Sequence, residues 1–168
     1  KEPASAPGTR ADSSAGGNAT SMAPGITASA VPTSGGGAYG ASRGYGAHAG
    51  VDISMPENTE LFALCSGKVA CVSHSWYHST DGKGEGMVSI ESDEQVGDFK
   101  AGTIFGYGHP DKIYVKNGEK VRQGDKLALS GSPGGGPHLH FFVNTEGKPC
   151  GNGNVDPTAL AKDLLTSG

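Results

Sequence analysis

Short stretches of apolar residues alternating with polar ones, separated by turns that contain glycine, make up the chain after residue 50. They are rich in Val, Ile, Tyr and Phe, and they predict β-strands at residues 60–65, 68–73, 87–91, 103–107, 112–115, 126–130 and 138–144. Ser66 and Gly67 separate the first two stretches and predict a β-hairpin between them. The pattern is typical of an all-β protein.

A short helix is expected near the C-terminal end of the chain. Asp156 has the residue type of an N-cap, and Pro157 after it fits the first helical position. Leu160, Ala161 and Leu164 would give this helix one apolar face. The predicted fold is therefore an antiparallel β-sheet or sandwich with one short C-terminal helix.

The composition excludes several classes of protein. The 168 residues include 29 glycines and 10 prolines, roughly twice the usual share, which disfavours a helix bundle or coiled coil. The net charge is −4 and there is no basic block, so we expect no nucleic-acid partner. No apolar run approaches the roughly 20 residues that cross a membrane, so we expect no membrane insertion.

The chain consists of two segments that differ in composition. Residues 1–25 are mostly Ala, Ser, Pro, Gly and Thr, which predicts a flexible linker or a tail that lies on the domain. Residues 26–168 contain the predicted strands and form the expected folded domain. Because the sequence begins at Lys1 and shows no signal-peptide pattern, we expect it to be one piece of a larger protein. We also expect the domain to be monomeric.

Four residues could form a metal site. His138 and His140 alternate with Leu139 on a predicted strand, so both imidazoles lie on one face, with Cα atoms roughly 6–7 Å apart. His48 and Asp52 are four residues apart, and we expect the intervening glycine to let the loop bend so that both point inward. Two histidines and a carboxylate form a known catalytic zinc set, which leaves a fourth position for water. Each motif alone is weak, since an H-x-H is more often a surface strand pair.

The wider order of motifs resembles the lysostaphin/LytM family of zinc peptidoglycan endopeptidases. The similarity extends from about residue 40 to residue 160. Its motifs are HAGVD at 48–52, SGKV at 66–69, YGH at 107–109, VxxGxxVxxGDxL at 115–127, SGS at 130–132, PHLHF at 137–141 and VDPTxL at 155–160. The resemblance implies a zinc metallopeptidase catalytic domain over residues 26–168, with a groove in the β-sheet that holds one Zn²⁺.

The resemblance also implies a role for each matching residue. The zinc ligands correspond to His48, Asp52 and His140, and two further active-site histidines correspond to His109 and His138. There is no H-E-x-x-H, so no helix glutamate can be the base, and an imidazole is the natural substitute. Which of His109 and His138 takes the proton stays open. A loop tyrosine that stabilises the tetrahedral intermediate is implied too, with Tyr45 as first candidate and Tyr39 as second.

The substrate implied by the resemblance is a peptide bond in peptidoglycan stems or cross-bridges. A Gly-Gly bond and a D-alanyl bond to a diamino acid both stay open. The expected location is extracellular, in the cell wall or on a virion, as in a bacterial autolysin or a phage tail lysin. The first alternative is a catalytically silent member of the fold that binds or regulates. The second is a lipoyl-like carrier domain modified at Lys126, which would leave the metal residues unexplained.

The remaining chemistry-bearing residues are the other histidines, the aromatics near them and the cysteines. His74 and His78 lie in a predicted polar loop and are expected to be exposed or to line the groove, and not to bind metal. Trp76 and Tyr77 in the same loop either wall the groove or pack on the sheet. The three cysteines leave two alternatives, which are a disulfide between Cys150 and either Cys65 or Cys71, or buried free thiols.

Overall fold

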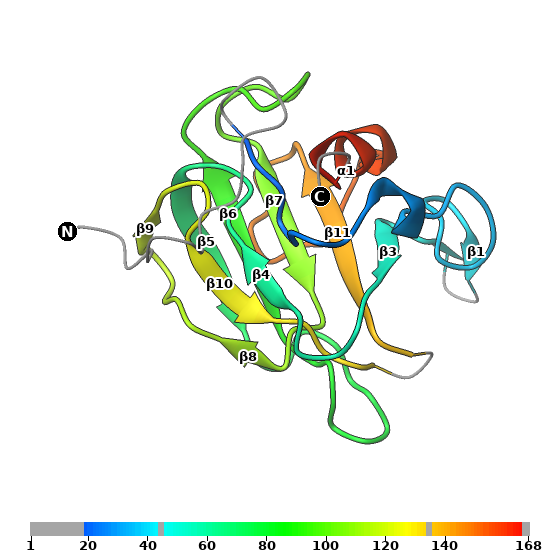
Figure 1. The fold of residues 1–168 in the computed structure, drawn as a ribbon. Coiled ribbons are helices and arrows are strands. Elements are labelled where there is room, and N and C mark those ends of the chain that lie inside the picture. The colour runs from blue at the N-terminus through cyan, green and yellow to red at the C-terminus, as the bar shows by residue number, and fades with distance from the viewer. Residues whose placement is uncertain (1–18, 44–45, 134–135, 166–168) are drawn as a thin grey trace.

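The computed structural model describes residues 19–43, 46–133 and 136–165 (Figure 1). Over these residues the strands form a six-stranded sheet in the order β3-β11-β7-β6-β5-β9, a three-stranded sheet in the order β4-β10-β8, and the ribbon β1-β2. All pairings are antiparallel, as predicted. The elements are β1 (Ser42–Arg43), β2 (Gly46–Ala47), β3 (Val51–Ser54), β4 (Glu60–Phe62), β5 (Gly67–Ser73), β6 (Met87–Ser92), β7 (Ile104–Gly108), β8 (Lys112–Ile113), β9 (Lys120–Val121), β10 (Lys126–Leu129), β11 (His138–Asn144), the 3₁₀ helix η1 (Ala28–Ala30) and the helix α1 (Thr158–Leu165).

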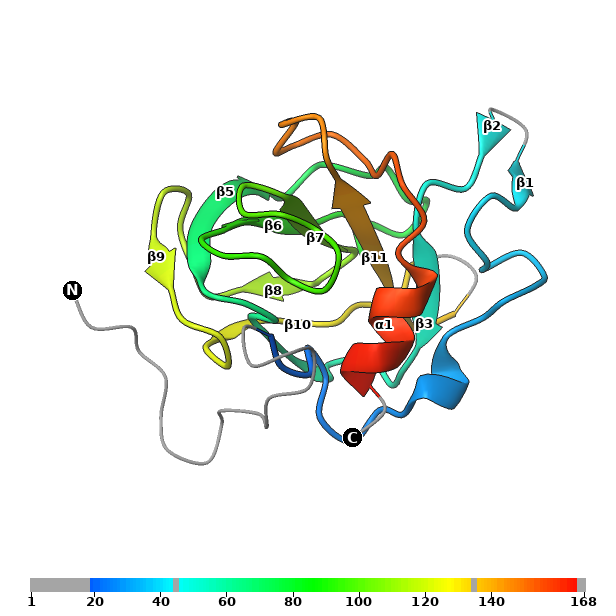
Figure 2. The same ribbon diagram turned by 90° about the horizontal axis from the view of Figure 1, so that it is seen from above.

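The hydrophobic core lies between the two larger sheets. The three-stranded sheet packs on one face of the six-stranded sheet, as the two views in Figures 1 and 2 show. Leu139, Phe141 and Val143 alternate along β11 and point into this core, where all three are fully buried. The alternation leaves the histidines of β11 on the opposite face of the sheet, as the sequence predicts.

Aromatic side chains cover this opposite face and lie close to the backbone of β7. Phe142 lies on it directly over Gly106 of β7, where a Cβ atom would collide with the ring. Trp76 stacks on Phe142 with ring centroids 5.6 Å apart and 15° between the ring planes. The glycines of β7 therefore let two aromatic rings lie against the sheet beside the histidines.

The predicted hairpin between residues 60–65 and 68–73 is wrong. β4 pairs with β10 in the three-stranded sheet, whereas β5 pairs with β6 and β9 in the six-stranded sheet. Gly67 is the first residue of β5 and not a turn residue. A Cβ there would collide with the Glu91 carbonyl on β6, so the close pairing of the two strands requires a glycine at this position. The segment between the two strands passes from one sheet to the other.

The C-terminal helix forms where it is predicted. Asp156 Oδ1 accepts a hydrogen bond of 2.9 Å from the Thr158 N–H, which satisfies one of the free donors at the start of α1. Leu160, Ala161 and Leu164 are buried and belong to the core. Figure 2 shows α1 beside β3 and β11.

The folded part begins earlier in the chain than expected. Residues 19–23 are buried, and Met22 is part of the hydrophobic core. The Thr20 N–H donates to the Leu64 carbonyl at 2.8 Å, and the Phe62 N–H donates to the Met22 carbonyl at 2.8 Å. Residues 19–23 therefore do not fit a flexible linker, whereas their burial is consistent with the alternative of a tail that lies on the domain. The rest of that expectation concerns residues 1–18, which lie outside the described residues.

Candidate metal centre and its groove

The register of three neighbouring strands brings the predicted metal ligands together. On β11, His140 pairs with Asp52 of β3 on one side and with Gly108 of β7 on the other. His48 lies just before β3, and its side chain is buried next to theirs. Residues 92 positions apart in the chain thus meet because two strands are adjacent in the sheet.

The three side chains place one ligand atom each at the corners of a nearly regular triangle. His48 Nε2 lies 3.1 Å from His140 Nδ1, His140 Nδ1 lies 3.1 Å from Asp52 Oδ1, and His48 Nε2 lies 3.2 Å from Asp52 Oδ1. Tetrahedral zinc with ligand bonds of about 2.0–2.1 Å separates its ligand atoms by roughly 3.3 Å. The triangle therefore has the size of three corners of a zinc tetrahedron. Among the described residues, no other group of three His, Cys, Asp or Glu side chains could hold a metal ion.

Hydrogen bonds on the outer side of both imidazoles fix which nitrogen faces the triangle. His48 Nδ1–H donates to the Ala38 carbonyl at 3.0 Å, and His140 Nε2–H donates to Asn152 Oδ1 at 3.0 Å. Asn152 Oδ1 also accepts the Gly153 N–H at 2.8 Å, which identifies it as the amide oxygen. His48 Nε2 and His140 Nδ1 therefore carry the lone pairs, which is the arrangement that ligating histidines have.

The third ligand is ionised. Burial alone would raise the pKa of Asp52, but hydrogen bonds from His140 and His48 outweigh burial and hold the pKa well below its ordinary range when the inward nitrogens carry protons. A cation in the triangle takes the place of those protons and favours the ionised carboxylate in the same way. Two inward lone pairs and a carboxylate within 3.2 Å of one another form a site that fits a cation. The residues present therefore fit the zinc ion that the sequence predicts.

Gly50 serves close packing and not the expected bend in the loop. Its backbone is not in the left-handed region. A Cβ atom at this position would lie 2.5 Å from the Phe141 carbonyl oxygen and 2.8 Å from His140 Cε1. The absence of a side chain therefore lets this segment lie directly against the metal-facing ring of His140.

His109 is held beside the triangle in an uncommon backbone conformation. It follows the end of β7 with φ +75°, and its N–H donates to the Gly86 carbonyl at 2.8 Å. Its Nδ1–H donates to the Gly84 carbonyl at 2.7 Å. The ring centroids of His109 and His138 are 5.2 Å apart. Burial lowers the pKa of His109 to about 4.

His138 approaches the same point from β11. Its Nδ1–H donates to the Gly136 carbonyl at 2.9 Å, and its Nε2 lies 3.5 Å from Asp52 Oδ1. Burial lowers the pKa of His138, although the negative charge of Asp52 opposes this effect. Both auxiliary histidines thus use Nδ1 to hold a backbone carbonyl and have Nε2 available for chemistry.

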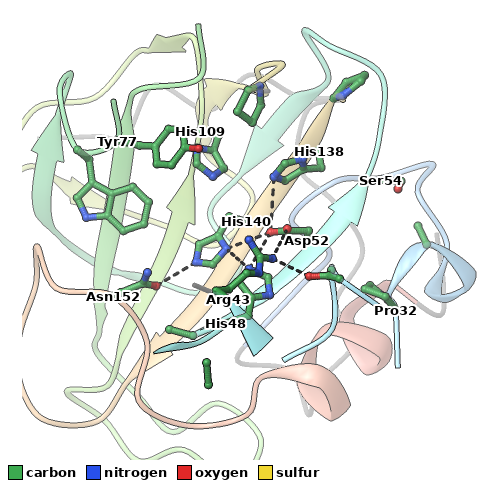
Figure 3. A pocket seen from close by; sticks show the side chains of 18 of the residues that line it. Pro32, Arg43, His48, Asp52, Ser54, Tyr77, His109, His138, His140 and Asn152 are labelled. Atoms are coloured by element: carbon green, nitrogen blue, oxygen red, sulfur yellow. Dashed lines mark hydrogen bonds and ion pairs between the residues drawn. The ribbon is translucent and has the colours of Figure 1, made fainter. Parts of the chain in front are cut away.

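These side chains line a cavity of about 1010 Å³ on the open face of the six-stranded sheet (Figure 3). Trp76 and Tyr77 form part of its wall, and Trp76 also packs on the sheet through Phe142, so both expected roles are combined. The glycine-rich segment before β3 forms another part of the wall. The lining residues are Ala30, Pro32, Gly36, Gly37, Ser42, Arg43, Ala47, His48, Ala49, Asp52, Ser54, Trp76, Tyr77, His109, Pro133, Pro137, His138, His140 and Asn152.

Several other residues that the sequence singles out lie elsewhere. Tyr45 lies outside the described residues, so its role stays a prediction, and Tyr39 packs against the hydrophobic core. His74 and His78 are exposed. Lys126 forms an ion pair of 3.0 Å with Glu60 on the three-stranded sheet.

One of the two cysteine alternatives is realised beside the groove. Cys71 and Cys150 form a disulfide, and Cys65 is a buried free thiol whose pKa burial raises to about 12. The Cys150 carbonyl also accepts a hydrogen bond of 3.1 Å from Trp76 Nε1. The disulfide therefore anchors the segment that brings Asn152 to His140.

Asn152 is the site residue that sequence reasoning missed. It lies in the run Gly151-Asn152-Gly153-Asn154, which is ordinary turn composition. Only the course of the segment after β11 shows that its amide reaches a ligand histidine.

Two histidines and one carboxylate around a shared centre are a known ligand set of zinc peptidases. The sequence model of peptidase family M23 matches residues 46–152, and the chain belongs to this family. The chain is 35% identical over 122 residues to peptidoglycan DD-endopeptidase ShyB of Vibrio cholerae, covering 71% of this chain and 25% of that protein. It thus spans about a quarter of the length of that relative.

Solved structures agree with this assignment. The catalytic domain of the antimicrobial peptidase lysostaphin from Staphylococcus simulans has a TM-score of 0.57 and 30% identity, covering 76% of this chain and 90% of that one. A zinc-containing peptidase from Vibrio cholerae has a TM-score of 0.53 and 28% identity, covering 74% of this chain and 36% of that one. The fold is therefore that of a lysostaphin-like domain, as the sequence predicts.

Proposed function

We propose that this chain is the catalytic domain of a zinc-dependent endopeptidase that hydrolyses peptide bonds in the stems or cross-bridges of bacterial peptidoglycan. The observation that carries the proposal is the triangle of His48 Nε2, Asp52 Oδ1 and His140 Nδ1, with edges of 3.1–3.2 Å and both imidazole tautomers set by outer hydrogen bonds. A purely structural cluster has no need of lone pairs directed at a shared centre.

His48, Asp52 and His140 would hold one Zn²⁺. When bound there, zinc would stabilise developing negative charge as a Lewis acid and lower the pKa of a coordinated water molecule. Ala38 and Asn152 keep the two imidazoles in the ligating tautomer, and the ionised Asp52 balances part of the charge of the metal.

His109 and His138 would act as the general base and general acid. Each donates Nδ1–H to a backbone carbonyl, so Nε2 is the atom that can accept a proton from the attacking water. Once protonated, the same Nε2–H can donate to the oxyanion or return the proton to the leaving amine. The two rings lie 5.2 Å apart, so both can reach one scissile amide.

The groove and the relatives support a peptidoglycan substrate. The cavity is open to solvent and has a floor of strands and walls of loops, which suits an extended peptide. The matched protein of Vibrio cholerae is described as a peptidoglycan DD-endopeptidase, and lysostaphin as an antimicrobial peptidase. A catalytically silent member of the family is not favoured, because all three ligands and both auxiliary histidines converge here.

An extracellular or cell-envelope location is consistent with a peptidoglycan substrate. One matched relative of Escherichia coli is described as a lipoprotein, and others as peptidoglycan endopeptidases. Within the described residues, no helix has the length and apolar character to span a membrane. We further propose that the domain acts as a monomer within a larger protein.

The test is digestion of purified peptidoglycan, with the released fragments identified by mass spectrometry. The protein is assayed as purified, after treatment with a chelator, and after zinc is added back. We expect fragments that arise from cleaved peptide bonds, their loss with chelator, and their return with zinc. Intact glycan strands and peptides from every wall type, with zinc shown to be bound, would contradict the proposal and favour a binding or regulatory domain.

A further inference from the structure

His109 depends on a neighbouring loop for the hydrogen bond that orients its ring. Its Nδ1–H donates to the carbonyl of Gly84, which lies in the loop of residues 74–86 between β5 and β6. The ring of Tyr77, from the same loop, meets the ring of His109 edge-on, with centroids 4.8 Å apart (Figure 3). The position of this loop therefore determines the direction in which Nε2 of His109 points.

Asp111 holds the loop at Gly84 itself. Its Oδ1 accepts a hydrogen bond of 2.7 Å from the Gly84 N–H, so Gly84 is bound at its nitrogen by Asp111 and at its carbonyl by His109. The Asp111 N–H in turn donates to the Leu129 carbonyl of β10 at 3.0 Å. Asp111 thus connects the loop to the three-stranded sheet. A carboxylate is also a stronger acceptor for a backbone N–H than a neutral oxygen.

Two glycines let the backbone pack closely around these hydrogen bonds. Gly84 has φ +67°, and a Cβ atom there would lie 2.8 Å from Pro133 Cβ. At Gly131, a Cβ atom would collide with the His109 carbonyl oxygen and lie 2.9 Å from Asp111 Oδ1. The acceptor, the loop and the histidine are therefore held together by packing as well as by hydrogen bonds.

We propose that Asp111 is a positioning residue for His109, which acts through Gly84 to keep Nε2 of His109 directed at the scissile amide. This inference rests on the proposed peptidase function. His109 has φ +75°, a conformation that residues other than glycine rarely adopt, so its place depends on the contacts around it. Without the carboxylate of Asp111, the Gly84 N–H loses this acceptor and the Gly84 carbonyl no longer fixes the ring.

The metal centre does not depend on the same contact. The imidazoles of His48 and His140 are held by Ala38 and Asn152. Loss of the Asp111 carboxylate should therefore change proton transfer by His109 and leave zinc binding as it is.

The test compares Asp111→Ala, which removes the acceptor, with Asp111→Asn, which keeps an acceptor oxygen at the same place. The substrate is a soluble muropeptide from a wall type that the wild-type protein digests, and kcat, KM and zinc content are measured. We expect kcat of Asp111→Ala to fall about 10–100-fold at unchanged KM and zinc content, because a small misplacement of a reacting group costs a rate factor of this order. Asp111→Asn should retain most of kcat. Asp163→Ala removes an exposed carboxylate of α1 and should change nothing.

Gly84→Ala moves the same carbonyl by a different route. Its Cβ would collide with Pro133 and displace the Gly84 backbone, so kcat should fall as in Asp111→Ala. Gly82→Ala is the matched control, because Gly82 lies in the same loop with φ +73° and a Cβ there meets nothing within 4 Å. It carries similar backbone strain without the collision and should keep its kcat.

Nuclear magnetic resonance of the ¹⁵N-labelled, zinc-loaded protein reports the ring directly. The hydrogen-bonded Nδ1 proton of His109 should give a signal that exchanges slowly with water, and its absence in His109→Gln assigns it. We expect this signal in the wild type and in Asp111→Asn, and its loss through faster exchange in Asp111→Ala.

Wild-type kcat in Asp111→Ala, or an unchanged ring signal in that variant, would overturn the proposal. So would an Asp111→Asn protein as slow as Asp111→Ala, or a loss of kcat matched by a loss of zinc or of folded protein, since Asp111 would then only support the fold. Cleavage of no peptidoglycan by the zinc-loaded wild type would instead refute the peptidase function, and the role of Asp111 with it, whatever the ring signal shows.

Discussion

Gly50 offers a sharp test of how the metal centre is built. Replacing it with alanine would place a Cβ 2.5 Å from the Phe141 carbonyl oxygen and 2.8 Å and 2.9 Å from His140 Cε1 and Nε2. Ordinary contacts of this kind are about 3.5 Å or more, so β3, β11 or the His140 ring must move by roughly 0.5–1 Å. The displaced atom Nε2 is the one that donates to Asn152, so the ligating tautomer loses its support.

The expected magnitude follows from two effects. Disturbing the outer contact of a ligand histidine typically costs about 10–100-fold in metal affinity or activity. Overpacking costs about 1–3 kcal/mol of stability, which lowers Tm by roughly 2–12 °C for a domain of this size. Gly50→Ala should therefore stay folded, bind zinc more weakly and regain part of its activity in excess zinc.

The assay is competition for zinc against a chromogenic chelator, with circular dichroism to check folding. Gly36→Ala is the matched control for metal affinity, because a Cβ there meets nothing within 4 Å. A Gly50→Ala protein with the zinc affinity and activity of the wild type would refute the packing argument.

Three further predictions concern the histidines, the disulfide and pH. His140→Ala should lose metal and activity together, whereas His109→Ala should keep its zinc and lose about 10²–10⁴-fold in kcat, and activity retained in either variant would reject these roles. Replacing Cys71 and Cys150 with serine should cost about 2–5 kcal/mol and lower Tm by roughly 4–20 °C, and calorimetry that finds an unchanged Tm would contradict this. Activity should fall at acidic pH, because ligand imidazoles must be neutral to bind metal. Burial lowers the pKa of His109 to about 4 and also lowers the pKa of His138, so these two histidines stay neutral in mild acid and zinc content should fall in parallel with the rate. A rate that falls while zinc stays bound would contradict that assignment.

The sequence predicts the parts of the site that depend on local periodicity. The alternation of His138, Leu139 and His140 is enough to place both histidines on one face of β11. The spacing of His48 and Asp52 indicates a second pair of ligands. That Asp52 pairs with His140 is a matter of strand register, which the resemblance to a family supplies and local pattern does not.

The parts that could not be predicted depend on distant segments of the chain. β4 lies in a different sheet from β5, although Ser66 and Gly67 have the composition of a hairpin turn. Met22 is buried although its neighbours are small and polar, because a long-range pairing with the segment around Phe62 places it in the core. Such pairings follow from the whole fold and leave little trace in local composition.

The outer contacts of the metal centre escaped prediction for the same reason. Ala38 holds His48 through its backbone carbonyl, and the residue type at position 38 does not indicate this hydrogen bond. Asn152 depends on the path of a loop anchored by Cys150, and the sequence left the cysteine pairing open. The sequence suggests that Gly50 lets the loop bend, whereas in the structure its missing side chain lets the backbone pack against Phe141 and His140.

The central claim is that His48, Asp52 and His140 bind a single zinc ion that is needed for peptide hydrolysis. The most direct measurement is the rate of fragment release from peptidoglycan as zinc is added stepwise to metal-free protein. The account predicts no rate without zinc, a linear rise, and a plateau at one equivalent per chain, with no rise for His140→Ala. Hydrolysis by metal-free protein, or the same zinc response in His140→Ala, would contradict it.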